Sequence, residues 1–293
     1  MSKKLQILLA LMCAILLLIG NVLPAHADLD AVEETAEEET PIVIPYTEVP
    51  LYANDEYIGT GFLIDSVTYV PMRAFLELML QNCDAVWEQD AETATLTSEG
   101  FFASYTMGSR YMVVNGRYLF FPDDAFNING TIVAPIRELA KIFSLDVNWD
   151  HEEWIIELDA SEPVVFASGD EFYDADSLYW LSRVIHAEAG NQPLEGMIGV
   201  GNVVLNRVMD ESNAFRNTIH DVIFQAGQFN VVELGGIYAA PGENAVIAAK
   251  LCLEGYNTVG DAKWFFNPKI SSSTWFDKYK TFVISIEDHN FYA

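Results

Sequence analysis

The sequence predicts an α+β protein with two folded domains, in which a small repeat module of strands and short helices precedes a mainly helical domain. Three observations favour this architecture. The chain has 293 residues, of which 51% are hydrophobic, enough for two hydrophobic cores. A polar break runs from about Asp159 to Asp176. Before the break a strand–helix–strand pattern repeats, whereas after it the apolar residues follow helical spacing.

The first 27 residues have the pattern of an export signal. Lys3 and Lys4 precede an apolar run, Ile7–Ile19, and Pro24–Ala27 offers a cleavage site between small residues. The run is too short to span a bilayer comfortably. We therefore expect residues 1–27 to be removed and the mature protein to be exported without a membrane anchor, with anchoring by an uncleaved signal as the alternative.

The chain is strongly acidic, with 15 basic and 43 acidic residues and a net charge of −28. Loss of the two signal lysines makes the mature chain more acidic still. Such a chain is repelled by nucleic acid and by anionic membrane surfaces, so we expect neither as a partner. Anionic wall polymers repel it as well, so any binding to a cell wall must come from shaped contacts with sugars.

Composition also indicates the domain boundaries. Acids dominate residues 28–43, which hold almost no large apolar side chain and are expected to form a disordered lead-in. We expect the repeat module at residues 44–158, a linker at residues 159–175 and the second domain at residues 176–293.

Two cysteines follow the export signal, Cys83 and Cys252, and they fall in different expected domains. They are either two buried thiols or one inter-domain disulfide. Export permits a disulfide, but two lone cysteines do not make a disulfide framework.

The first domain contains an internal repeat. Thr68–Phe75 recurs as Ile132–Leu139, and each copy then reaches a tryptophan, Trp87 or Trp149. In each copy we expect a short strand, a proline that opens an amphipathic helix, and a strand near the tryptophan. Asn-Gly dipeptides between the helices of the two copies predict hairpin turns.

The Pro-x-Arg pair and the trailing tryptophan resemble the small α+β module named for the amino-terminal domain of copper amine oxidases. The resemblance covers most of Tyr46–Leu158, and such modules are common in exported bacterial proteins. The name implies no copper here, because the segment has one histidine, His151, and no His-x-His pair. We expect Arg73 and Arg137 to lock each helix against a carboxylate or carbonyl, and we interpret the module as a spacer or adhesion element.

Glu188 is the candidate catalytic residue of the second domain. A helix is predicted over Ser177–Ala189, and apolar residues at helical spacing lead from Leu181 through Ile185 to Glu188. Glu188 should therefore lie on the buried side of this helix. Burial disfavours a charged carboxylate and raises its pKa, which makes the group a usable proton donor near neutral pH.

A second helix is expected from near Pro193 to about Val208. It contains Gly196, Gly199 and Gly201, which destabilise a helix unless another backbone approaches closely. We therefore expect this helix to pack tightly under the first one and to hold the candidate acid at the floor of a groove.

Two other readings of this region stay open. Glu188 can instead form a structural ion pair with Arg183 or Arg207, or cap the next helix, because such pairs also perturb pKa values. His186 and His289 raise the question of zinc, but the His-x-Glu spacing places its two side chains on different helix faces and no His-Glu-x-x-His pattern occurs. We expect no metal and no cofactor.

Five segments taken in order resemble the bacterial cell-wall hydrolases typified by spore cortex-lytic enzymes. They read AEAGNQPLEG, VGNVVLNRV, VIFQAGQF, WFFNP and HNFY, and the resemblance spans nearly all of Leu178–Tyr292. In that family the glutamate of the first segment is the catalytic acid/base, and it matches Glu188. The family often continues with Arg-Gly-Glu-Pro, whereas this chain has Gly190–Pro193, which puts any role of the missing arginine and second acid in doubt.

The resemblance implies a lysozyme-like, lytic-transglycosylase-like fold and cleavage of peptidoglycan glycan strands between N-acetylmuramic acid and N-acetylglucosamine. It also implies action outside the cell, in the wall or spore envelope, with spore cortex lysis during germination as one setting. An ordinary glycosidase needs two facing carboxylates, and the sequence shows one persuasive acid. A lytic transglycosylase manages with one, because the 6-hydroxyl and acetamido groups of the substrate replace the water and the nucleophile.

Further residues are candidates for substrate binding. Gln228 is expected to hydrogen-bond an acetamido group, with Phe229 beneath a sugar ring. Asn267 is expected to orient the acid or the sugar, and Tyr256 and Trp275 to stack on sugar faces. For each aromatic residue, a packing role is at least as well supported by the sequence.

Two alternative functions remain at this point. The protein is a hydrolytic N-acetylmuramidase if Asp210, Asp221 or Asp261 lies across the groove from Glu188. It is a non-catalytic wall-binding or spore-structural protein if the hydrolase-like domain is inactive.

Overall fold

A computed structural model describes residues 45–80, 82–128, 130–159, 168–270 and 274–293. The protein is α+β, as predicted, with one large hydrophobic core in the β-rich first domain and another in the helical second domain. The predicted export signal and acidic lead-in, and about half of the predicted linker, lie outside the described residues. Among the described residues, no helix has both the length and the apolar character needed to cross a membrane.

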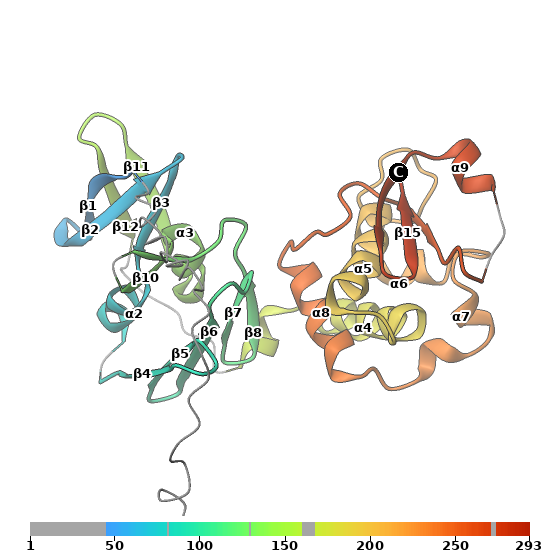
Figure 1. Cartoon of the computed structure of the whole chain (residues 1–293), viewed down its shortest axis with the longest axis horizontal. Coiled ribbons are helices and arrows are strands. Elements are labelled where there is room, and N and C mark those ends of the chain that lie inside the picture. The colour runs from blue at the N-terminus through green and yellow to red at the C-terminus, as the bar shows by residue number, and fades with distance from the viewer. Residues whose placement is uncertain (1–44, 81, 129, 160–167, 271–273) are drawn as a thin grey trace, which may run out of the picture. The chain divides into compact units, whose positions relative to one another are not determined.

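The described strands of the first domain form two sheets (Figure 1). One has the order β11-β12-β1-β2-β3-β10-β9 and is antiparallel apart from the parallel β1–β12 pair. The other is the antiparallel meander β4-β5-β6-β7-β8. The strands are β1 (Thr47–Ala53), β2 (Glu56–Ile64), β3 (Val67–Pro71), β4 (Asp84–Glu88), β5 (Thr93–Ser98), β6 (Phe101–Thr106), β7 (Tyr111–Val114), β8 (Arg117–Phe120), β9 (Phe126–Ile128), β10 (Thr131–Pro135), β11 (Asp146–Asp150) and β12 (Ile155–Asp159).

The internal repeat is confirmed as a structural repeat. In the first copy β3 leads into helix α2 (Met72–Met79) and then β4, and in the second β10 leads into α3 (Ile136–Ala140), a 3-10 turn η1 (Lys141–Phe143) and β11. Pro71 and Pro135 stand immediately before the helices with φ of −56° and −58°, close to the value that a proline ring imposes.

The two repeated arginines make the kinds of contact that the sequence predicted. Nε of Arg73 donates to Oε1 of Glu77 at 2.7 Å on the exposed face of the same helix, and Nη1 of Arg137 donates to the carbonyl oxygen of Val147 in β11 at 2.9 Å. Only the second contact therefore ties a helix to a strand. Between β7 and β8, Asn115 and Gly116 have φ of 48° and 89°, the left-handed values that a tight hairpin requires.

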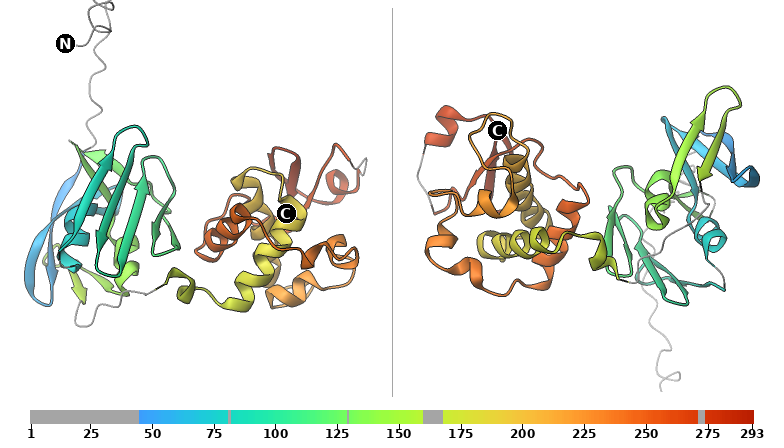
Figure 2. Two further views of the ribbon diagram at one scale, coloured as in Figure 1. Left: turned by 90° about the horizontal axis from the view of Figure 1, so that it is seen from below. Right: turned by 180° about the vertical axis from the view of Figure 1, so that it is seen from behind.

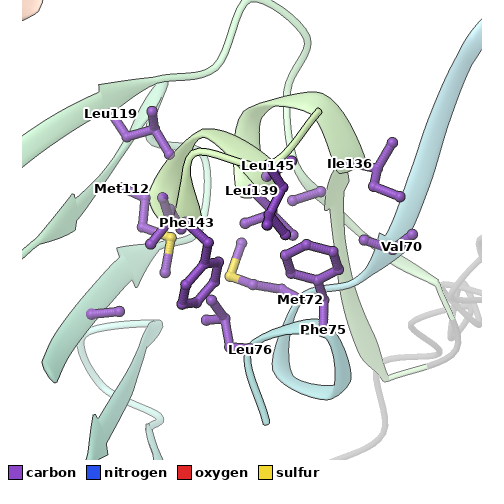
Figure 3. Close-up of a cluster of buried hydrophobic side chains, with 14 of the residues drawn as sticks. Val70, Met72, Phe75, Leu76, Met112, Leu119, Ile136, Leu139, Phe143 and Leu145 are labelled. Carbon is purple, nitrogen blue, oxygen red and sulfur yellow. The ribbon is translucent and has the colours of Figure 1, made fainter. Parts of the chain in front are cut away.

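The core of the first domain gathers side chains from both sheets and both helices (Figure 3). Met72 and Leu76 of α2 and Leu139 of α3 point toward Met112 and Leu119 of the meander, and all five are at most 3% exposed. The amphipathic helices thus fill the space between the sheets, which explains why each repeat copy places a helix directly after a strand.

The second domain is built around helices α4, α5 and α8, which pack against one another (Figure 2). A small antiparallel sheet, β13-β15-β14, covers part of this bundle. The elements are η2 (Gly169–Phe172), α4 (Ala175–Ala189), α5 (Leu194–Val208), α6 (Ile219–Ile223), α7 (Asn230–Glu233), η3 (Gly236–Tyr238), α8 (Glu243–Leu253), β13 (Trp264–Phe266), α9 (Trp275–Tyr279), β14 (Phe282–Ile286) and β15 (His289–Tyr292).

The two predicted helices around the candidate acid are confirmed as α4 and α5. Asp174 caps α4, because its carboxylate accepts a hydrogen bond from the backbone N–H of Ser177 at 2.8 Å. α5 is buried on nearly every side. A Cβ added at Gly201 would lie 2.9 Å from Ile185 of α4, which confirms the predicted close approach of the two helices.

The expectation that another backbone approaches the α5 glycines is wrong, because their close neighbours are side chains. A Cβ at Gly201 would lie 2.6 Å from Sγ of Cys252 in α8, and one at Gly199 would lie 2.8 Å from Cζ of Phe291 in β15. Cys252 is 3% exposed and Cys83 is half-buried, and both are free thiols. The buried-thiol reading thus applies to Cys252, and the alternative of an inter-domain disulfide is wrong.

Candidate active site

Glu188 opens onto a pocket of about 560 Å³ in the second domain. The pocket lies where the end of α4 meets the turn before α7, the end of β13 and the turn between β14 and β15. It is lined by Glu188, Asn191, Gln192, Arg207, Gln228, Phe229, Asn230, Phe265, Phe266, Asn267, Ile270, Asp288 and His289. Five segments of the chain, among them the end of α5 with Arg207, thus contribute to the lining.

Glu188 is half-buried, one residue before the end of α4. Burial raises the pKa of its carboxyl group, and the nearby Arg207 guanidinium opposes this rise. Within the described residues, neither a hydrogen bond nor an ion pair engages the Glu188 carboxylate. A carboxyl group that faces a pocket, has a raised pKa and has no structural partner is suited to donate a proton to a bound molecule.

The arginines considered as structural partners of Glu188 are held elsewhere. Arg183 places its guanidinium carbon 3.5 Å from the centre of the Tyr179 ring and donates to the Tyr179 carbonyl oxygen. Nε of Arg207 donates to the carbonyl oxygen of Lys263 at 2.7 Å. Arg207 therefore acts on Glu188 through its charge and not through a direct ion pair in this structure.

A second carboxylate, Asp288, lines the same pocket, and the sequence reasoning did not single it out. Its Oδ1 accepts from Nζ of Lys269, and its Oδ2 accepts from Nε2 of Gln192 at 3.4 Å. These two hydrogen bonds lower the pKa of Asp288, so this carboxylate is ionised at neutral pH. The pocket thus holds one carboxyl group whose pKa is raised and one whose pKa is lowered.

Gln192 explains how this chain accommodates its departure from the usual family segment. Its side chain is buried and donates to Asp288, and its Oε1 accepts from the Asp288 backbone N–H at 3.3 Å. An acid at this position would place a second negative charge against Asp288. The amide instead joins the turn after α4 to the β14–β15 turn without that repulsion.

Three of the predicted substrate-binding residues, Gln228, Phe229 and Asn267, line the pocket together with Glu188. The turn before α7 contains Gly227 with φ of 74°, a left-handed value that glycine adopts without strain. This turn leaves Gln228 half-buried and Phe229 buried at 5% exposure. Oδ1 of Asn267 accepts from the backbone N–H of Lys269, which leaves the amide nitrogen of Asn267 for other partners.

The other two predicted substrate-binding residues do not line this pocket. Tyr256 stacks on Phe120 with ring centres 4.5 Å apart, so the contact that was expected with a sugar is made with protein. Trp275 lies in α9 and is exposed, with its ring 5.7 Å from Tyr279. Sequence spacing places both aromatics in the right domain but does not show which way the chain turns after α8 and β13.

The three acids proposed as partners for a hydrolytic mechanism also lie outside the pocket lining. Asp210 accepts from Lys263 and Ser212, which lowers its pKa to about 2. Asp221 is paired with His220 at 3.0 Å. Asp261 is exposed. Any second carboxylate for hydrolysis must therefore be Asp288 rather than one of these three.

His289 contributes an unsatisfied polar atom to the pocket. The residue is 6% exposed, and its Nδ1 has no hydrogen-bond partner among the described residues. Burial lowers the pKa of His289, against the opposing effect of Asp288, so the ring is neutral near pH 7. A buried ring nitrogen without a partner is uncommon in folded proteins.

The sequence held weak signals for the residues that were missed. Asp288 directly precedes the HNFY segment that was recognised, and Gln192 lies in the Gly190–Pro193 departure. Arg207 closes the VGNVVLNRV segment but was considered only as a structural partner. The signals from Asp288 and Gln192 required the β14–β15 turn to be placed beside the end of α4, and that from Arg207 required the end of α5 to be placed beside the end of α4. Spacing alone does neither.

Comparison with known families assigns a class to each domain. Residues 191–292 match the Cell Wall Hydrolase family, and residues 53–158 match the Copper amine oxidase N-terminal domain. The chain therefore combines a cell wall hydrolase domain with a copper-amine-oxidase-N-like module, as the residue patterns indicated. Glu188 lies just before the matched hydrolase segment.

Individual relatives are spore cortex-lytic enzymes and related wall hydrolases. The spore cortex-lytic enzyme of Bacillus cereus is 33% identical over 103 residues, which is 35% of this chain and 39% of the relative. The enzyme of the same name from Bacillus subtilis (strain 168) is 34% identical over 32% of this chain and 30% of the relative. The chain thus spans well under half the length of these relatives.

Two further comparisons cover more of the matched protein. The cell wall hydrolase CwlJ of Bacillus subtilis (strain 168) is 27% identical over 38% of this chain and 81% of the relative. The solved catalytic domain of the germination-specific lytic transglycosylase SleB from Bacillus anthracis is 30% identical. That match covers 41% of this chain and 97% of the solved one, with a TM-score of 0.38.

Proposed function

We propose that this protein is an exported enzyme that cleaves peptidoglycan between N-acetylmuramic acid and N-acetylglucosamine, as a lytic transglycosylase that uses Glu188 as its only acid/base. The observation that carries the proposal is the state of Glu188. It is a half-buried carboxyl group with a raised pKa, it faces a pocket, and within the described residues no protein group neutralises it.

The reaction follows from one carboxyl group that changes its protonation state twice. Protonated Glu188 gives its proton to the glycosidic oxygen, and the bond from that oxygen to C1 of the muramic acid breaks. The resulting carboxylate then takes the proton of the 6-hydroxyl group as the 6-oxygen attacks C1. The products are a 1,6-anhydro end and a free 4-hydroxyl, and the acid has regained its proton.

The other pocket residues have supporting roles in this scheme. Phe229 offers an apolar surface beneath a sugar ring, while Gln228 and Asn267 offer amide groups that match the acetamido substituents of the glycan. His289 offers an unsatisfied ring nitrogen for a further hydrogen bond. The relatives that are named as spore cortex-lytic enzymes support spore cortex lysis as the setting for this protein.

One observation favours hydrolysis as a second candidate function. Asp288 is an ionised carboxylate in the same pocket and has the charge that a nucleophile or base requires. Its two carboxylate oxygens already accept from Lys269 and Gln192, which lowers its reactivity toward water or sugar. Because both oxygens of Asp288 already accept hydrogen bonds from the protein, we prefer transglycosylation to hydrolysis.

The test is digestion of purified peptidoglycan, with the products separated and identified by mass. Wild-type protein should release fragments with anhydro-muramic ends, whereas reducing ends would instead support a muramidase. No release at all would support a binding protein. Glu188→Gln should abolish release while the circular dichroism spectrum stays unchanged, and retained activity would remove Glu188 from the mechanism.

Asp288→Asn separates the two enzymatic candidates. The variant keeps a similar shape but loses the negative charge, so a transglycosylase should retain activity within about tenfold, which reflects the disturbed contacts to Gln192 and Lys269. A muramidase that uses Asp288 as its second carboxylate should lose several orders of magnitude. Asp221→Asn, remote from the pocket, is the matched control and should behave like wild type.

The first domain is proposed to be a spacer or adhesion element. Its charged residues do not form a metal site among the described residues. Deletion of residues 28–158 should leave anhydro-end formation on soluble glycan fragments intact, and pull-down on intact sacculi would show whether the module adds wall affinity.

A further inference from the structure

Arg207 is a buried cation that keeps one hydrogen-bond donor unused. It is 4% exposed near the end of α5, and its Nη1 has no partner among the described residues. The side chain is nevertheless held firmly. Nε donates to the Lys263 carbonyl oxygen at 2.7 Å, and the guanidinium carbon lies 5.0 Å from the ring centres of Phe215 and Phe229.

A buried cation with an unpaired N–H group destabilises the folded protein. Such a group is expected where the donor finds a hydrogen-bond partner during function. Taking a charge and its N–H groups out of water is unfavourable, and folded proteins leave few such donors unsatisfied. Burial lowers the pKa of Arg207 to about 10, and Glu188 opposes this, so the side chain is still a cation at neutral pH. The cation lines the same pocket as Glu188, which has no direct partner of its own in the described part of the chain.

We infer that Arg207 is the positioning residue for Glu188, and that its unused Nη1 donates to the carboxylate that Glu188 becomes after it gives its proton to the glycosidic oxygen. The inference rests on the proposed function for its catalytic meaning. Before proton transfer Glu188 is neutral and needs no ion pair. After transfer a full negative charge lies in a partly buried site, and the fixed cation stabilises it once the Glu188 side chain moves within hydrogen-bonding distance of Nη1.

Other charged groups face the same pocket, and each has a defined partner or charge state. Asp288 is paired with Lys269 and Gln192, and the lowered pKa of His289 keeps its ring neutral near pH 7. Lys263, whose carbonyl oxygen accepts from Arg207, is not part of the pocket lining, and its ammonium group is paired with Asp210. Arg207 is therefore the pocket cation with an unused donor within the described residues.

Nuclear magnetic resonance of the full chain tests the inference directly. The carboxyl carbon of Glu188 is followed through pH in wild type, Arg207→Met and Arg207→Lys. Loss of the cation should move the Glu188 midpoint upward by about one pH unit, and lysine should restore most of the shift because it keeps the charge. Arg183→Met is the matched control. Arg183 lies in α4 beside the Tyr179 ring and outside the pocket lining, so its loss should leave the Glu188 midpoint unchanged.

A second measurement uses no arginine variant and so does not depend on its folding. The guanidinium proton and nitrogen signals of Arg207 should shift in wild-type protein with the same midpoint as Glu188, and the shift should vanish in Glu188→Gln. A Glu188 midpoint that is equal in wild type and folded Arg207→Met would overturn the inference. So would guanidinium signals that ignore the Glu188 midpoint.

Activity measurements separate this inference from the proposed function. With peptidoglycan, the high-pH limb of kcat/KM should move upward in Arg207→Met together with the carboxyl midpoint, and Arg207→Lys should return it. If wild-type protein releases no anhydro ends but the midpoints still shift, the proposed function fails while the electrostatic pairing stands. If anhydro ends form and the midpoints do not shift, the proposed function stands and the pairing of Arg207 with Glu188 fails.

Discussion

Replacement of Gly201 by alanine tests how tightly α5 packs against α4, the helix that carries Glu188, and against α8. The added Cβ would lie 2.6 Å from Sγ of Cys252 and 2.9 Å from Cδ1 of Ile185, whereas ordinary contacts lie at 3.4–4 Å. Both neighbours are at most 3% exposed, so neither can move into solvent. Overpacking of this kind costs about 1–3 kcal/mol, and the better helix propensity of alanine returns about 0.5–1 kcal/mol. We expect a net loss of about 1–2 kcal/mol in the free energy of unfolding.

Gly196→Ala is the matched control in the same helix. Its added Cβ would lie 3.2 Å from Cβ of Gln192 and at least 3.6 Å from everything else, so propensity should dominate and stability should be unchanged or slightly higher. Urea unfolding followed by far-ultraviolet circular dichroism measures both variants, because the long helices all belong to the second domain.

A double-mutant cycle then tests the cause of the Gly201 effect. Cys252→Ala removes the sulfur atom that the new Cβ would meet, so the Gly201→Ala penalty should shrink by about 1 kcal/mol in that background. The reasoning is refuted if Gly201→Ala is as stable as Gly196→Ala, or if the penalty is the same with and without the sulfur. Because Ile185 lies one turn before Glu188, Gly201→Ala should also lower activity.

Three other outcomes follow from the same structure. Burial raises the pKa of Glu188 in the folded protein above its value in the unfolded chain. The ionised carboxylate therefore lowers the free energy of unfolding at a pH above the folded-state pKa, and the protonated group at low pH does not. Glu188→Gln should be more stable than wild type in urea at pH 8 and equal to it at pH 3. Asn206→Leu should lose about 2–4 kcal/mol of unfolding free energy in the same assay, because the amide donates to two loop carbonyls at 2.8 Å that would be left without partners. Phe229→Ala should reduce release from peptidoglycan at least tenfold, whereas Trp275→Ala, outside the pocket, should change it less than threefold, and the opposite order would move the sugar site toward α9.

Local patterns were sufficient to predict the helices that carry the site and the repeat of the first domain. Helical spacing from Leu181 to Glu188 placed the acid on the inner side of α4, and the glycines of α5 indicated a close neighbour. These features depend on residues within a few turns of one another, where geometry is fixed by the backbone period.

The sequence by itself therefore determined the two domain classes, the strand–proline–helix repeat and the identity of the candidate acid. Only the tertiary structure decided which side chains share the pocket with Glu188. The lining includes Arg207, Asp288 and His289 and does not include Tyr256 or Trp275. Asp288 and His289 reach the pocket because the β14–β15 turn folds back beside the end of α4, and Arg207 reaches it from the end of α5. Long-range approach of this kind is set by packing of the whole core, and no local period or spacing encodes it.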